Sequence, residues 1–202
     1  MKTALTERFG ESIPEVHPAW QPGKVKLPTE QQIVMNTPAS PTSILGIDPG
    51  LNITGYGVLQ NSGQGLHIVE AGVVRAKRTD LPQRINTIYN GIRDVIESFQ
   101  PDSVAIEELY SHYAHPKTAI LMGHARGAIC LAAAQAEIPV YHYAATQIKK
   151  ILTGNGHASK TQMQMAICHE FKLPEPPSPP DVADALAIAL CHFYQSRTSK
   201  VL

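Results

Sequence analysis

The chain has 202 residues with 17 basic and 17 acidic side chains, so its formal net charge is zero at neutral pH. This length suffices for one domain with a sizeable core, and a zero net charge does not by itself favour a nucleic-acid partner. The sequence nowhere supplies the roughly 18 consecutive apolar residues of a membrane span, so we expect no membrane association.

The N-terminal segment differs in composition from the rest. Its first 43 residues carry six prolines and scattered hydrophobic residues, without the period of a helix or a strand. Such a segment cannot bury enough apolar surface to offset the entropy of ordering. We therefore expect a disordered extension over residues 1–43, a folded domain over 44–197 and a short tail over 198–202.

Targeting signals and cysteine usage indicate the compartment. The extension lacks the basic start and apolar stretch of a signal peptide, and its four glutamates do not fit a transit peptide. Cys130, Cys168 and Cys191 are odd in number, widely spaced and set in apolar contexts, which is typical of thiols in a reducing compartment. The sequence therefore predicts a cytoplasmic protein.

Three strand-like runs open the domain at residues 44–48, 54–60 and 66–76, and the glycine-rich connections between them indicate an antiparallel meander. Residues 81–99 have apolar side chains at helical spacing, with Asp80 as a possible N-cap. The sequence predicts that this helix is amphipathic.

The second half alternates strands with helices. Residues 103–107 form a short apolar run that is typical of a buried strand parallel to the first. The remaining predicted elements are a helix over 117–137, a strand over 139–143, helices over 144–153, 159–171 and 179–196, and a Pro-rich linker over 173–180. This order indicates an α/β domain with a mixed five-stranded sheet flanked by helices.

Two of the predicted strands end in a carboxylate, Asp48 and Glu107. Ligands of α/β sheets bind beyond the carboxyl ends of the strands, so these acids converge if their strands are neighbours. Asp181 and Asp184 are three residues apart on a predicted helix and therefore share one face. Four carboxylates at one sheet end would repel unless cations neutralise them, and hard-oxygen ligands fit Mg²⁺ or Mn²⁺. Two such ions about 4 Å apart would suit phosphodiester hydrolysis.

Each acid also has a purely structural interpretation. Asp48 before Pro-Gly is typical of a turn, and Asp181 has the spacing of a capping box with Ser178. Glu107 is harder to explain this way, because an unpaired acid at the end of an apolar strand is costly to bury. Only the four acids together favour a metal site. The 13 basic residues from residue 44 onward would then outnumber the nine remaining acids, which is compatible with DNA.

Four stretches resemble, in order, the RuvC-type Holliday junction resolvases: 44-ILGIDPGLNITGYGV-58, 104-VAIEELY-110, 121-LMGHARGAI-129 and 181-DVADALAIA-189. The resemblance runs from about residue 44 to residue 193. It implies an RNase H-like fold and a homodimer that cuts two opposing strands of a four-way DNA junction symmetrically, with two Mg²⁺ ions per subunit, in recombination and repair. It also implies that the catalytic, metal-binding acids are Asp48, Glu107, Asp181 and Asp184. Some members have a His where this sequence has Asp181.

The resemblance extends to DNA-binding residues and partners. It implies that Lys149 and Lys160 approach the DNA backbone near the scissile phosphate, where their charge would favour the transition state. Tyr110 lies where several relatives carry a Phe proposed to insert among bases at the crossover. Each of the three residues also has a purely structural interpretation. The lysines would be solvated surface charges, and Tyr110 a half-buried loop aromatic. The family's RuvA and RuvB branch-migration proteins are implied partners.

The helix within 121–134 places Gly123 and Gly127 four residues apart, so that another helix can approach closely. In the family this region forms the dimer contact, and a two-fold dimer would carry two symmetric active sites. Packing against a helix of the same subunit is the other interpretation.

Other functions fit less well. The segment 154-GNGHASKT-161 nearly matches a phosphate-binding loop, but a predicted helix precedes it and Ser159 with Gln162 predicts a capping box. Actin-like kinases share the Asp-Pro-Gly turn but need two such domains, for which this chain is too short. A junction-binding protein without cleavage activity would be expected to have lost one acid. A proofreading exonuclease would have Asp-x-Glu on the first strand, which Asp48 does not fit, whereas a YqgF-type relative stays open.

Overall fold

One mixed sheet organises the domain. The computed structural model describes residues 42–62, 65–76, 80–109 and 116–198, all within one compact unit of residues 38–202. The sheet contains β1 (Thr42–Asp48), β2 (Ile53–Ser62), β3 (Gly65–Arg75), β4 (Ser103–Glu107) and β5 (Val140–Tyr143), in the order β3-β2-β1-β4-β5. β1 pairs antiparallel with β2 and parallel with β4, β2 pairs antiparallel with β3, and β4 pairs parallel with β5. The predicted meander and mixed five-stranded sheet are confirmed.

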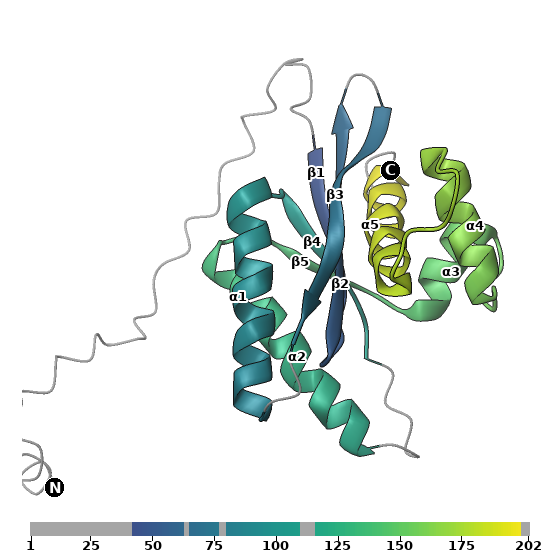
Figure 1. The fold of residues 1–202 in the computed structure, drawn as a ribbon. Coiled ribbons are helices and arrows are strands. Elements are labelled where there is room, and N and C mark those ends of the chain that lie inside the picture. Colours follow the sequence, from purple (N-terminus) through teal and green to yellow (C-terminus); the bar gives the residue numbers. More distant parts are fainter. Residues whose placement is uncertain (1–41, 63–64, 77–79, 110–115, 199–202) are drawn as a thin grey trace, which may run out of the picture. The chain divides into compact units, whose positions relative to one another are not determined.

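Helices cover both faces of this sheet (Figure 1). They are α1 (Leu81–Phe99), α2 (Pro116–Gln135), α3 (Ala145–Thr153), α4 (Lys160–Phe171) and α5 (Pro180–Thr198). α1 and α2 share one buried core with the sheet, whereas α3, α4 and α5 share a second core on the opposite face. No helix among the described residues combines the length and the apolar character needed to cross a membrane.

The element boundaries differ from the predicted ones by a few residues. β1 starts at Thr42, and α5 continues to Thr198, so both edges of the domain extend slightly beyond 44–197. Most of the predicted extension, residues 1–41, lies outside the described residues, as does the tail beyond Thr198.

Side-chain caps explain where two helices begin. The Asp80 carboxylate accepts a hydrogen bond of 3.0 Å from the Gln83 amide at the start of α1. Ser159 and Gln162 form a reciprocal capping box at the start of α4. Residues 154–161 therefore end one helix and start the next, which removes the local basis for a phosphate-binding loop.

The two central parallel strands alternate between the two cores. In β1, Ile44 belongs to the α5-side core, whereas Leu45 and Ile47 belong to the α1–α2 core. Ile47 pairs with Ile106 of β4, which also lies on the α1–α2 side. Since successive strand residues point to opposite faces, the residues that follow, Asp48 and Glu107, both point to the α5 side.

α5 lies unusually close to the sheet because glycines face it. A Cβ atom placed on Gly46 of β1 would lie 2.2 Å from the carbonyl oxygen of Ala185, and one on Gly55 of β2 would lie 2.1 Å from that of Asp181. Real Cβ atoms essentially never approach other atoms within 3.0 Å. Any larger residue at either position would therefore force α5 away from the strands.

Candidate active site

The carboxyl ends of β1 and β4 place two acids side by side. Asp48 is the last residue of β1 and Glu107 the last of β4, and the two strands are parallel neighbours. Because both side chains point to the α5 side, they share one edge of the sheet. The condition on which the sequence argument depended, that these strands are adjacent, is therefore met.

The first turns of α5 bring the other two acids to the same place. Asp181 lies over Gly55, the residue of β2 that pairs with Asp48. Asp184 lies one turn further along α5 and is half-buried. The Thr54 hydroxyl donates a hydrogen bond of 2.8 Å to the Gly50 carbonyl within the turn that follows Asp48.

The electrostatics show that all four acids interact. The pKa of Asp48 is raised from its ordinary value of 3.8 to about 7, first by burial and then, in order of strength, by the charges of Asp184, Glu107 and Asp181. Burial and the charge of Asp184 also raise the pKa of Glu107. Carboxylates held this close disfavour full ionisation.

Two lysines enter the same site. The Lys160 ammonium donates a hydrogen bond of 3.0 Å to Asp184 Oδ2, and this contact is the main cause that raises the pKa of Lys160. Lys149 of α3 lowers the pKa of Glu107. Glu107, Asp184 and both lysines line a pocket of about 240 Å³ between α3, α4 and α5. Tyr110 lies outside the described residues.

One contributor was not singled out from the sequence. Arg126 of α2 lowers the pKa of Glu107, and its Nη2 atom lies 3.0 Å from His142 Nδ1 on β5. Arg126 lies within the stretch 121-LMGHARGAI-129, but the neighbouring residues do not indicate which side chain a single arginine on a helix will approach. Only the pairing of β4 with β5 places it near Glu107.

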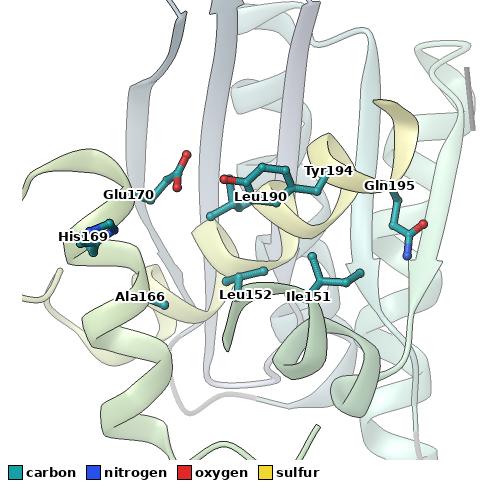
Figure 2. A pocket seen from close by; sticks show the side chains of 8 residues that line it. All are labelled: Ile151, Leu152, Ala166, His169, Glu170, Leu190, Tyr194 and Gln195. Atoms are coloured by element: carbon teal, nitrogen blue, oxygen red, sulfur yellow. The ribbon is translucent and has the colours of Figure 1, made fainter. Parts of the chain in front are cut away.

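A second pocket has a volume of about 490 Å³ (Figure 2). Its lining comes from α3, α4 and α5: Ile151, Leu152, Ala166, His169, Glu170, Leu190, Tyr194 and Gln195. Burial and a hydrogen bond with Glu170 raise the pKa of Tyr194 to about 12. None of the four acids lines this pocket, so its size alone does not mark it as the active site.

The acids fit a divalent cation by chemistry. In the described part of the chain, no three His, Cys, Asp or Glu side chains already lie in an arrangement that would hold a metal ion. The donors around Asp48 are carboxylate oxygens, which are the ligands that Mg²⁺ prefers. A cation among them would relieve the repulsion that raises the pKa of Asp48. The residues present therefore fit Mg²⁺.

Comparison with known proteins decides the family. A family model described as "Crossover junction endodeoxyribonuclease RuvC" matches residues 44–192. This chain belongs to the RuvC family. The RuvC of Rhodopirellula baltica is 52% identical over 164 residues, which cover 81% of this chain and 92% of that protein. The RuvC of Photobacterium profundum is 45% identical and covers 78% of this chain and 90% of its own length.

Solved structures agree with this assignment. The Thermus thermophilus RuvC structure is 34% identical, with a TM-score of 0.72, and covers 78% of this chain and 97% of its own. T. thermophilus RuvC in complex with Holliday junction substrate has a TM-score of 0.73 at 33% identity, over 78% of this chain and 96% of its own. The RNase H-like fold expected for a RuvC protein is confirmed. The RuvC match also leaves the YqgF-type and phosphate-binding-loop interpretations without support.

Proposed function

We propose that this chain is a structure-selective endonuclease that resolves four-way DNA junctions by symmetric, Mg²⁺-dependent phosphodiester hydrolysis. The observation that carries the proposal is the convergence of four carboxylates from β1, β4 and α5 at one edge of the sheet, in a chain of the RuvC family. The solved T. thermophilus RuvC bound to a Holliday junction supports the choice of substrate.

The proposed metal ligands are Asp48, Glu107, Asp181 and Asp184. Asp48 lies at the centre of the cluster, since its pKa responds to the other three acids, and it is the proposed ligand shared by two ions. When bound, Mg²⁺ would lower the pKa of a coordinated water and stabilise the leaving oxygen, and Mn²⁺ would substitute for it. The chain itself holds the carboxylates on two strands and a helix, so little reorganisation is needed when the substrate arrives.

The lysines are proposed to bind the DNA backbone. Lys149 and Lys160 line the pocket that also contains Glu107 and Asp184. Lys160 is paired with Asp184 in the protein alone, so an incoming phosphate would compete with that carboxylate for the ammonium. Binding of this kind weakens as the salt concentration rises, because phosphate contacts release counterions.

We also propose that the active form is a homodimer built on α2. Ile120 and Leu131 are 60% and 52% exposed although both are large and apolar. An added Cβ on Gly127 would meet nothing within 4 Å, and one on Gly123 only a Leu109 methyl at 4.0 Å. The described part of the subunit therefore leaves this helix face open to a second copy, and a two-fold dimer would supply paired symmetric cuts.

The family resemblance supports one further part of the proposal, and the cysteines support another. RuvA and RuvB are the proposed branch-migration partners. The three cysteines are free thiols, which fits a reducing cytoplasm.

The test of the function is incubation with a synthetic four-way junction and with linear duplex of the same sequences, in Mg²⁺ and in chelator. We expect paired nicks at symmetric positions in the junction only, and only with Mg²⁺. Equal cutting of linear duplex would refute junction selectivity, and cutting in chelator would refute the role of the metal.

Asp48→Asn tests the assignment of the acids. The variant keeps the size of the side chain but removes the charge needed to hold the ions, so nicking should fall by at least about 1000-fold. Junction affinity in chelator should be kept, because phosphate contacts supply most of the binding free energy. Asp94→Asn, on the exposed side of α1, is the matched control and should leave nicking unchanged. Undiminished nicking by Asp48→Asn would remove Asp48 from the site.

A further inference from the structure

The turn that follows Asp48 is held by an arginine from the opposite side of the sheet. Arg84 of α1 donates hydrogen bonds of 3.2 Å from Nε and 3.0 Å from Nη2 to the carbonyl oxygen of Leu51. Its Nη2 also donates to Oδ1 of Asn52. The planar guanidinium thus grips the turn at two adjacent residues, with a geometry that a lysine cannot reproduce.

Two other elements hold the same turn. The hydroxyl of Thr54, which is fully buried in β2, donates a hydrogen bond of 2.8 Å to the Gly50 carbonyl. The amide of Ala76, just after β3, donates one of 3.0 Å to the Asn52 carbonyl. Among the hydrogen bonds of the described residues, those of Arg84 join the turn to α1, where the Leu51 side chain is also buried, whereas the others join the turn to its own meander.

Movement of this turn would displace Asp48, because the turn starts directly after Asp48 and leads into β2, whose Gly55 pairs with Asp48 and lies against Asp181. Arg84 opposes outward movement of the turn from the α1 side, through the backbone carbonyl of Leu51.

We propose that Arg84 is a positioning residue that holds the turn after Asp48 closed, so that Asp48 stays aligned with the acids of β4 and α5. This inference rests on the proposed function for its effect on cleavage. Its structural half, the restraint of residues 49–53, is independent of DNA and of metal.

The test compares Arg84→Lys and Arg84→Ala with Arg93→Lys. Arg93 lies on the same helix, but its ion pairs are with Asp94 and Glu97 of α1 itself, at 2.9 and 3.4 Å. Amide hydrogen exchange of residues 50–53 is measured in chelator without DNA, at a temperature where all variants have the circular dichroism spectrum of the wild type. Junction affinity in chelator and the single-turnover nicking rate in Mg²⁺ are measured on the same preparations.

We expect both Arg84 variants to lose protection at residues 50–53 and to nick about 100-fold more slowly, since displacements near 1 Å cost about this much. Their junction affinity should equal that of the wild type, and Arg93→Lys should match the wild type throughout. Nicking at the wild-type rate in Arg84→Lys and Arg84→Ala would overturn the proposal, whether or not the turn loses protection. Slower nicking with unchanged protection would overturn the proposal as well, because the effect of Arg84 on nicking would then not act through the turn.

The two proposals fail in different ways. If wild-type protein nicks no junction, the proposed function is refuted. Loss of protection in the Arg84 variants would in that case still support the restraint of the turn by Arg84.

Discussion

Asp48 lies where its own charge is unfavourable. The pKa of Asp48 is about 7 in the folded chain, against an ordinary value of 3.8. At pH values between these two, the folded state holds a proton that the unfolded state has released. The stability that this group contributes is fully present below pH 3.8 and is lost as the pH rises through about 7. The raised pKa of Glu107 acts in the same direction. The site is therefore less stable at neutral pH than a structure without this cluster would be.

This leads to a prediction about stability in chelator. Between about pH 5 and about pH 8, the free energy of unfolding of the wild type should fall relative to that of Asp48→Asn by on the order of 1–3 kcal/mol. Asparagine carries no charge to be repelled, so the variant should be the more stable protein at the higher pH. Mg²⁺ should remove most of the difference by stabilising the wild type. Urea unfolding at several pH values measures this, and parallel curves for the two proteins would contradict it.

At the scale of elements, the contact between α5 and the sheet sets the geometry of the site. Gly46 faces the backbone of Ala185 and Ala189, while α5 carries Asp181 and Asp184 in its first turns. The helix can lie this close only because no side chain intervenes. The positions of Asp181 and Asp184 therefore depend on a glycine that takes no part in the proposed reaction.

Gly46→Ala should therefore affect both stability and activity. The added methyl would lie 2.2 Å from the Ala185 carbonyl oxygen, so α5 must shift, at a cost of about 1–3 kcal/mol. Nicking should fall more than the loss of folded protein explains, because the shift separates Asp184 from Asp48. Met165→Ala is the control, since the Met165 side chain is 65% exposed on α4. Urea unfolding and nicking rates test this, and full activity of Gly46→Ala would refute the close contact.

At the scale of the whole molecule, the exposed face of α2 determines the proposed assembly. Ile120→Glu places a charge on that face, so the dimer should dissociate while each subunit stays folded. Sedimentation should report a monomer, and junctions should receive single rather than paired nicks. Met165→Glu is the control, because Met165 is 65% exposed on α4, away from α2. A variant of Ile120 that remains dimeric would place the interface elsewhere.

Much of this architecture could be predicted from the sequence, because the relevant signals are local. The helical spacing over 81–99, the cap at Asp80 and the strand that ends at Glu107 depend on neighbours within a few residues. The convergence of the four acids followed from the rule for strand ends, together with the spacing of Asp181 and Asp184.

The contacts between distant elements could not be predicted. The bonds from Arg84 to Leu51 span 33 residues, and the influence of Arg126 on Glu107 depends on where α2 lies. Nothing near Gly46 or Gly55 in the sequence indicates that α5 packs directly against them. Such contacts depend on strand order and helix placement, which no local pattern encodes.

Successive residues of β1 face opposite cores. Inserting or deleting one residue within β1 would therefore reverse the face to which Asp48 points. Asp48 shares a face with Ile44 and Gly46, whereas Ile47 lies on the face covered by α1 and α2. Deleting Ile47 would turn the Asp48 carboxylate toward the core formed by α1 and α2 and leave Glu107 without its neighbouring carboxylate. Substitutions can therefore adjust this strand gradually, but a single-residue insertion or deletion within it would abolish the site in one step.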